Sequence, residues 1–109
     1  MEQFLIDFKY IKNDMPIGHV EICSNKEDFT DGLVWISELY VIDSYRHNGI
    51  GTRLMNRAID TCKKLSIPRL YLYCKPKLIP FYKKFGTEDT CQKMNGYDLM
   101  MINIDQLKK

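Results

Sequence analysis

The sequence predicts an α+β (α/β-like) fold: a mixed central β-sheet with an N-terminal hairpin, a βαβ unit, a short second helix and a C-terminal hairpin. Three observations carry this prediction. Apolar and polar residues alternate in several short segments, as in strands buried on one face. Between residues 49 and 65 the apolar spacing changes to that of an amphipathic helix. The 109 residues suffice for one modest core, so residues 1–109 are expected to form a single domain.

The N-terminal half is predicted to contain three strands. Residues 4–12 alternate, with aromatic side chains on one face and charged ones on the other. Residues 13–16 are typical of a turn, so residues 17–23 are interpreted as the second strand of a hairpin, with Val20 and Ile22 on the face opposite Ile17. The polar, acidic residues 25–32 are interpreted as a loop. Residues 33–42, rich in β-branched and aromatic side chains, are the third strand.

The C-terminal half is predicted to begin with a helix over residues 49–65. Its apolar stripe consists of Ile50, Leu54, Met55, Ala58, Ile59, Cys62 and Leu65. Pro68 ends the helix, and residues 69–74 alternate again, which predicts a βαβ unit with parallel third and fourth strands. Residues 77–85 are expected to be a short helix that stops at Gly86. Residues 88–105 are expected to be a hairpin turning at Asn95-Gly96.

The composition excludes several classes of function. The net charge of +2 is too small to indicate a nucleic-acid or membrane partner, and no apolar run approaches the about 20 residues that span a bilayer. Residues 1–11 do not resemble a signal peptide. No C-x-x-C pair occurs, and His19 and His47 lie at no zinc-like spacing from a cysteine. We therefore expect reduced thiols, no metal and a cytoplasmic location; the cysteines are Cys23, Cys62, Cys74 and Cys91.

The stretch between the third strand and the long helix is a candidate anion site. Gly49 and Gly51 allow a ligand to approach the backbone closely, at a helix start where free N–H groups and the positive end of the helix dipole face outward. Such a place binds phosphate oxygens. Arg46 and the Thr52 hydroxyl would strengthen the binding of an anion there.

Two familiar phosphate-binding loops do not fit this stretch. Leu54 occupies the third glycine position of a dinucleotide G-x-G-x-x-G loop, and no Gly-Lys-Ser or Gly-Lys-Thr follows as in a P-loop. The pattern that remains is R-x-x-G-x-G directly after a strand. From the residues alone, a second interpretation stays open, in which the glycines only permit a tight strand-to-helix turn.

Two motifs in order resemble a known family. ELYVIDSYRHNGIG at residues 38–51 resembles the signature of the GNAT superfamily of acyl-CoA-dependent N-acyltransferases, in which an apolar strand ending in L-x-V leads through a short loop to R-x-x-G-x-G. FYKKFG at residues 81–86 resembles the family's F-Y-x-K-x-G landmark. The resemblance covers residues 33–86 well. It indicates a short form that lacks the family's usual N-terminal strand and helices.

The resemblance implies an N-acetyltransferase that uses acetyl-CoA as co-substrate, by direct attack of an amine in a ternary complex. It implies that the strand backbone at Leu39, Tyr40 and Val41 would bind the pantetheine arm, and that Lys75 stands where the family often has a pantetheine-binding Asn. The N–H groups that would hold the pyrophosphate belong to His47, Asn48, Gly49, Ile50, Gly51 and Thr52.

Two catalytic roles follow from the same resemblance. Tyr82 would stand near the thioester sulfur and protonate the departing thiolate, and Glu38 would relay the amine proton through water. A backbone N–H near Val41 would meet the oxyanion. The alternatives are that Tyr82 is an ordinary core residue and that Glu38 is a solvated strand residue.

The acceptor side is expected to be open, or completed by another subunit, because the sequence begins at the hairpin. An open side favours a protein lysine or N-terminus as acceptor. A small-molecule amine acetyltransferase acting as a dimer, and a non-catalytic acyl-CoA- or protein-binding module, are the alternatives. An exposed apolar face on the first hairpin would favour a homodimer; its residues are Phe4, Ile6, Phe8 and Tyr10.

Overall fold

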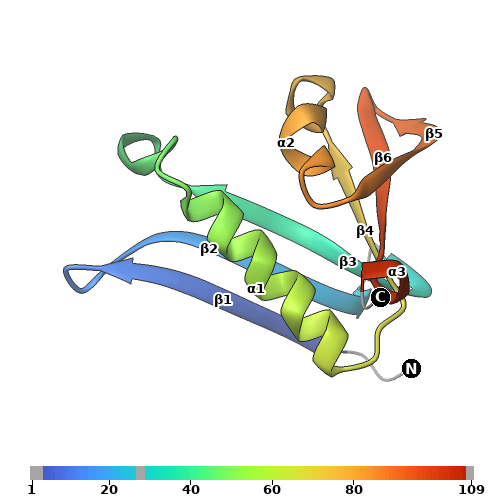
Figure 1. Cartoon of the computed structure of the whole chain (residues 1–109), viewed down its shortest axis with the longest axis horizontal. Coiled ribbons are helices and arrows are strands. Elements are labelled where there is room, and N and C mark those ends of the chain that lie inside the picture. The colour runs from blue at the N-terminus through green and yellow to red at the C-terminus, as the bar shows by residue number, and fades with distance from the viewer. Residues whose placement is uncertain (1–3, 27–28, 108–109) are drawn as a thin grey trace.

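The computed structural model describes residues 4–26 and 29–107 and forms one mixed six-stranded sheet with helices (Figure 1). The strands are β1 (Phe4–Lys12), β2 (Met15–Lys26), β3 (Phe29–Val41), β4 (Arg69–Cys74), β5 (Thr87–Met94) and β6 (Tyr97–Asn103). The helices are α1 (Ile50–Lys64), α2 (Ile79–Lys83) and α3 (Ile104–Leu107), with 3₁₀ turns η1 (Asp43–Tyr45) and η2 (Pro76–Leu78). The strand order β1-β2-β3-β4-β6-β5 confirms the predicted mixed sheet.

The first hairpin turns at Asn13 and Asp14, whose φ angles of 52° and 63° match the mirror-image turn that hairpins favour. A bulge follows, because Tyr10 pairs with Gly18 while Ile11 pairs with Pro16. The extra residue, Ile17, is fully buried together with Val20. Placing Ile17 on the opposite face was wrong, since the bulge interrupts the simple alternation on which that prediction rested.

The predicted loop over residues 25–32 is mostly strand. β2 continues through Lys26, which pairs with Phe29 at the start of β3. The polar composition of residues 25–32 suggested a loop. These residues are nevertheless mostly strand, because backbone pairing at the end of a hairpin does not require apolar side chains. Glu27 and Asp28, two of the acidic residues in that segment, lie outside the described residues.

The aromatic face of β1 is covered by α1, which corrects the predicted exposed patch. Phe4, Phe8 and Tyr10 are half-buried and pack against the core. The Arg57 guanidinium lies 4.6 Å from the centroid of the Phe8 ring, and Arg53 donates a 2.9 Å hydrogen bond to the Tyr10 hydroxyl. The guanidinium groups of these two arginines lie over the Tyr10 and Phe8 rings. The aromatic face of β1 is therefore not available as the homodimer interface that was predicted. The homodimer itself stays a prediction.

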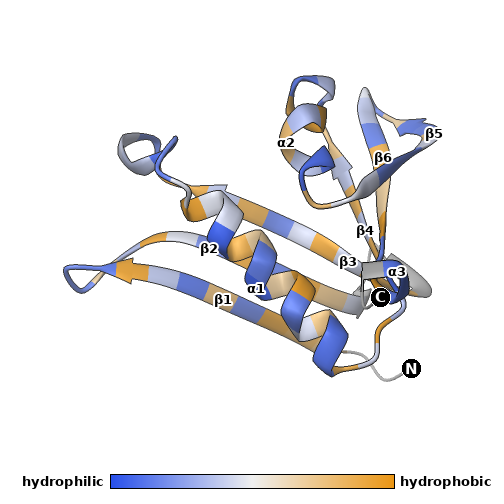
Figure 2. Cartoon of the chain, in the orientation of Figure 1, coloured by the Kyte–Doolittle hydropathy of each residue, from blue (hydrophilic) through white to orange (hydrophobic). Residues whose placement is uncertain are grey.

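α1 is amphipathic as predicted. Its buried residues are Ile50, Leu54, Met55, Ala58, Ile59 and Cys62. Leu65, also assigned to the stripe, is 53% exposed because the helix ends at Lys64. Figure 2 shows hydrophilic and hydrophobic bands alternating along α1, as a helix with one side on the sheet requires.

The C-terminal half matches its prediction with two differences. The β5–β6 hairpin turns at Asn95 and Gly96, with φ of 52° and 82°. The predicted helix over residues 77–85 is divided into η2 and α2, since proline at 76 and 80 removes two backbone donors. The last strand was predicted to end at Ile104, but β6 ends at Asn103 and Ile104 begins α3, where its N–H donates to the Pro68 carbonyl over 2.8 Å.

The sheet forks between β3 and β4. These strands are parallel, as predicted, and within the described residues their ladder pairs Trp35 with Tyr71. From there β1–β3 and β4–β6–β5 diverge (Figure 1). At the closed end of the fork, Trp35 stacks on Tyr73 with ring centroids 5.4 Å apart, and its ring lies 5.5 Å from that of Tyr71. The fork is the feature that creates the candidate site.

Candidate functional site

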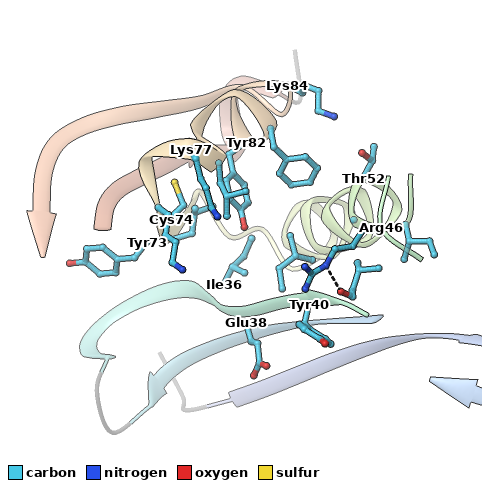
Figure 3. Close-up of a pocket in the computed structure, with 18 of the residues that line it drawn as sticks. Ile36, Glu38, Tyr40, Arg46, Thr52, Tyr73, Cys74, Lys77, Tyr82 and Lys84 are labelled. Carbon is cyan, nitrogen blue, oxygen red and sulfur yellow. Dashed lines mark hydrogen bonds between the residues drawn. The ribbon is translucent and has the colours of Figure 1, made fainter. Parts of the chain in front are cut away.

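A cavity of about 970 Å³ fills the fork between β3 and β4 (Figure 3). Its walls come from β3, the loop and first turn of α1, the end of β4, and α2. Of the predicted site residues, those that line it are Glu38, Leu39, Tyr40, Val41, Arg46, His47, Gly49, Ile50, Gly51, Thr52, Lys75 and Tyr82. The fold thus brings together residues that are up to 44 positions apart in the chain.

One edge of β3 is open to this cleft. The N–H of Ile42 donates to the Ile17 carbonyl over 2.9 Å and therefore faces β2. Backbone groups of successive strand residues point to alternate sides, so those of Val41 and Leu39 face the fork. The backbone of Tyr40 faces β2, which distinguishes it from the other two residues predicted to bind a pantetheine arm. Leu39 and Val41 can accept an added extended segment as a further strand would.

One end of the cleft is the start of α1. Gly49 precedes the helix with φ of 80°, and His47 also has a positive φ of 66°. The backbone hydrogen bonds of α1 begin where the N–H of Arg53 donates to the Gly49 carbonyl. The N–H groups of Ile50, Gly51 and Thr52 precede that bond and have no acceptor within the helix. A Cβ added at Gly49 would meet nothing within 4 Å, so the space beside Gly49 is open.

Arg46 braces the loop that leads to this end. Its Nε donates to the Val41 carbonyl over 2.8 Å, and its Nη1 lies 2.7 Å from Asp43 Oδ1. The guanidinium also lies 5.6 Å from the centroid of the Tyr40 ring. Arg46 therefore holds the end of β3 against the loop, in addition to lining the cleft. Asn48 lies outside the cleft lining and donates to the Tyr45 carbonyl over 3.4 Å.

The other end of the cleft is formed by Tyr82. Its side chain is nearly buried, and Figure 3 shows its hydroxyl directed from α2 toward β3. Burial, with a smaller contribution from Cys74, raises the pKa of Tyr82 to about 12. Burial also raises the pKa of Cys74, with Asp98 and Asp89 adding to it. Tyr82 is therefore a proton-bearing hydroxyl throughout the neutral range.

Glu38 lies on the other face of β3 from Tyr82 (Figure 3). A bulge places it there, because Glu38 pairs with Glu21 while Ile36 pairs with Ile22. The side chain of Glu38 is 56% exposed at the outer mouth of the cleft. Tyr82 and Glu38 thus both line the cavity, with their side chains on opposite faces of β3.

Sequence analysis missed two residues next to Glu38. Nε2 of His19 lies 3.3 Å from Glu38 Oε1, and Nδ1 of the same ring lies 3.0 Å from Asp7 Oδ1. No local motif connects these residues, since each comes from a different strand. The signal that could have found them is the register of the three strands.

The cleft is predominantly basic. Among the described lining residues, the carboxylate of Glu38 is accompanied by four cationic side chains. These are Arg46, Lys75, Lys77 and Lys84. Lys77 and Lys84 were not predicted, although both stand in or beside the second motif. Lys84 Nζ lies 4.8 Å from the centroid of the Phe81 ring. The charges suit a ligand with several phosphate oxygens.

Over residues 4–26 and 29–107, no three His, Cys, Asp or Glu side chains are placed to hold a metal ion. The described helices include none that is both long and apolar enough to cross a membrane.

Known proteins share both the sequence pattern and the fold. Residues 2–87 match the acetyltransferase (GNAT) family. Over 89 residues the chain is 32% identical to N-alpha-acetyltransferase 50 of Danio rerio, which covers 78% of this chain and 52% of the relative. The chain therefore spans about half the length of this curated relative.

Two solved structures illustrate the likeness of fold. PaiA N-acetyltransferase from Thermoplasma acidophilum, in complex with coenzyme A, superposes with a TM-score of 0.76 at 20% identity, covering 91% of this chain and 60% of the other. An aminoglycoside 6′-N-acetyltransferase complexed with coenzyme A gives 0.77 at 17% identity, covering 92% and 73%.

Proposed function

Because the chain belongs to the acetyltransferase (GNAT) family, we propose that it transfers an acetyl group from acetyl-CoA to a primary amine. One observation carries the proposal: the open edge of β3 leads from the free N–H groups at the start of α1 to the buried hydroxyl of Tyr82. An acyl-CoA needs a phosphate site, an extended channel and a reaction site in that order. The coenzyme A in two structures of the same fold supports this choice of co-substrate.

The coenzyme would lie along the cleft as follows. Its pyrophosphate accepts hydrogen bonds from the N–H groups of Gly51 and its neighbours in the first turn of α1, where the helix dipole also favours negative charge. Its pantetheine arm pairs with the open backbone groups of Leu39 and with the N–H of Val41, whose carbonyl already accepts from Arg46 Nε. Lysines at the rim add attraction for the phosphates.

The reaction requires a neutral amine. A lysine-type ammonium has a pKa near 10.4, so a carboxylate at the outer mouth must accept its proton, directly or through water. Glu38 is the carboxylate in that place. The amine then attacks the thioester carbon, and a backbone N–H on the open edge of β3, at Val41 or Leu39, stabilises the oxyanion. The product of this step is an intermediate with a cationic nitrogen.

Tyr82 completes the reaction as the C–S bond breaks. Its proton passes to the departing sulfur, and the cationic nitrogen of the intermediate returns a proton to the phenolate. A hydroxyl of pKa about 12 is a weaker acid than a thiol near 8.5, so full transfer alone is uphill by about 5 kcal/mol. That cost is well below the about 16 kcal/mol barrier of a reaction at about 10 per second. Tyr82 thus keeps its proton at neutral pH and can still donate it to the departing sulfur within the energy of the barrier.

The proposed acceptor is a protein amine, either a lysine or an N-terminus. The exposed carboxylate of Glu38 at an open mouth suits an amine that protrudes from a larger molecule. The name of the Danio rerio relative, an N-alpha-acetyltransferase, supports this class. An acceptor that is a small amine is the second candidate, supported by the likeness to an aminoglycoside 6′-N-acetyltransferase.

Calorimetry and a thiol-release assay test the proposal. Acetyl-CoA is expected to bind in the micromolar range typical of substrates, and free CoA thiol should appear only when an amine is added. Peptides with a free N-terminus or a lysine should outperform small polyamines and aminoglycosides. Binding without thiol release from any amine would instead identify a non-catalytic acyl-CoA-binding module. Light scattering over a dilution series tests the predicted homodimer.

A further inference from the structure

His19 connects two carboxylates on the outer face of the sheet. Its Nδ1 lies 3.0 Å from Asp7 on β1, and its Nε2 lies 3.3 Å from Glu38 on β3. The side chains of His19 and Asp7 are 26% and 27% exposed, so the row is half-shielded from water. Both ring nitrogens of His19 therefore face a carboxylate.

The strand register builds this row. In the β1–β2 ladder His19 is opposite Lys9, and in the β2–β3 ladder it is opposite Tyr40. Its two carboxylate partners are therefore diagonal neighbours, at a distance that long side chains span. The other charged or titratable groups facing this area are Lys9 on β1, Glu21 on β2 and Tyr40 on β3, with Arg46 above the Tyr40 ring.

Glu21 and Glu38 are opposite each other in the β2–β3 ladder, next to the bulge on β3, but their carboxylates contact different partners. Ser37 Oγ donates a 2.6 Å hydrogen bond to Glu21 Oε1. Glu38, the next residue, is turned toward His19. The histidine thus has one acid behind it, at Asp7, and one at the mouth of the cleft.

We propose that His19 is a positioning residue that receives, through Glu38, the proton removed from the acceptor amine. The inference rests on the proposed function. Asp7 accepts the Nδ1 proton and so fixes the tautomer in which Nε2 is unprotonated and faces Glu38. The same logic orients the histidine of a Ser-His-Asp triad, where a buried aspartate holds one ring nitrogen.

The proton balance is simple. The acceptor ammonium gives one proton to the Glu38 carboxylate and becomes a neutral amine. The protonated Glu38 passes that proton to Nε2 of His19 and returns to the carboxylate. The imidazolium then loses its extra proton to solvent, to which the His19 side chain is 26% exposed. Each turnover therefore releases one proton by this route, and the second amine proton ends on the CoA thiol.

The kinetic test compares three variants with acetyl-CoA and an amine-bearing peptide. His19→Gln can still donate or accept a hydrogen bond but cannot carry the proton. We expect its kcat at pH 7 to fall at least tenfold, with KM for acetyl-CoA changed less than twofold. Near pH 10 the loss should largely disappear, because the amine there deprotonates by itself. Asp7→Asn should show a weaker loss with the same dependence on pH.

A matched control and an independent measurement make the test decisive. Asp60→Asn removes a carboxylate from the solvent face of α1 and should leave the pH profile unchanged. ¹⁵N NMR of the His19 ring should show the Nδ1–H tautomer in the wild type, and loss of that preference in Asp7→Asn. An unchanged His19→Gln rate, a loss that is equal at all pH values, or an Nε2–H tautomer would overturn the proposal. If the wild type acetylates no amine, the proposed function fails, and the NMR result still decides whether the row is arranged as inferred.

Discussion

The two ends of the cleft are built in different ways. The end at which we propose that phosphates bind, called the phosphate end, lies within residues 46–52, and its geometry follows from a glycine-rich turn into a helix. The end at which we propose that the reaction occurs, called the reaction end, combines Tyr82 on α2 and Glu38 on β3 with His19 on β2 and Asp7 on β1, and these groups meet because of strand register and two bulges. A local motif can therefore specify where a coenzyme binds, while the residues that act on the acceptor depend on long-range pairing.

The two ends also differ in burial. Gly49 and the loop before it are exposed, and the space above Gly49 is empty of protein atoms. Tyr82 is nearly buried and its titration is shifted by that burial. The difference predicts a division of labour, in which changes at one end alter coenzyme affinity and changes at the other alter turnover. A variant at the phosphate end that alters only turnover, or one at the reaction end that alters only coenzyme affinity, would contradict this division.

The largest effect is expected from Tyr82→Phe. Removal of the hydroxyl should lower kcat about hundredfold, the lower range for a positioned general acid, while the Kd of acetyl-CoA changes little. Steady-state kinetics and calorimetry on the same preparation measure the two quantities. A kcat that stays within threefold of the wild type, with chemistry rate-limiting, would show that Tyr82 is a core residue.

Gly49→Val tests the phosphate end and should weaken acetyl-CoA binding at least tenfold, about 1.4 kcal/mol. The added side chain would occupy the open space beside Gly49, where the pyrophosphate is proposed to approach the start of α1. Gly96→Val is the matched control, because Gly96 has nearly the same φ and equally free space but lies in the β5–β6 turn. Both variants carry the strain of a left-handed residue, so both lose stability. Equal affinities in the two variants would contradict the placement of the pyrophosphate.

The buried reaction end should also make stability depend on pH in the alkaline range. The pKa of Tyr82 is about 12 in the folded chain and 10.0 as a reference, so between these values the unfolded chain releases a proton that the folded chain keeps. The stability that Tyr82 contributes is complete well below pH 10 and falls as the pH rises, by about 1.4 kcal/mol at pH 11.

Urea unfolding between pH 9 and 11 under reducing conditions measures this dependence. Cys62, whose pKa burial raises from 9.0 to about 11, contributes a similar fall that begins one pH unit lower. Tyr82→Phe should lose its own part of the fall and retain the parts of Cys62 and Cys74, two thiols whose pKa burial raises, so its stability curve should be flatter than that of the wild type. Parallel curves would mean that Tyr82 is not the titrating group.

Most of the fold was visible in the sequence, because its elements carry local signals. β1 and β4 were predicted to the residue, and Asn95-Gly96 marks the last hairpin without help from the rest of the chain. The failures have non-local causes. Ile17 is buried because of a bulge, and the rings of β1 are covered by arginines from α1, a helix more than 40 positions away.

The candidate site shows the same limit. The phosphate end and Tyr82 were predicted because each stands in a short motif. His19 and Asp7 were missed, since their relation to Glu38 exists only after three strands have paired in one register. A slip of one residue in β2 would send His19 to the other face of the sheet. Residues of this kind become candidates only when the pairing is known.

The smallest effect is expected from the lysines at the rim of the cleft. Lys84 lines the cavity and its ammonium lies 4.8 Å from the centroid of the Phe81 ring, while the adjacent Lys83 is exposed outside the cleft lining. Lys84→Gln should weaken acetyl-CoA binding by up to about fivefold, the value of an exposed ion pair, and Lys83→Gln should have almost no effect. Because the attraction acts through solvent, the difference between the two variants should shrink as salt is raised from 0.05 to 0.5 M in calorimetric titrations, conditions in which the Debye length falls from about 14 to about 4 Å. The kcat of both variants should equal that of the wild type, since neither lysine reaches the reaction end. A Lys84→Gln variant that binds normally but turns over slowly would place this lysine with Tyr82 rather than with the phosphates, and the boundary between the two ends would have to move along α2.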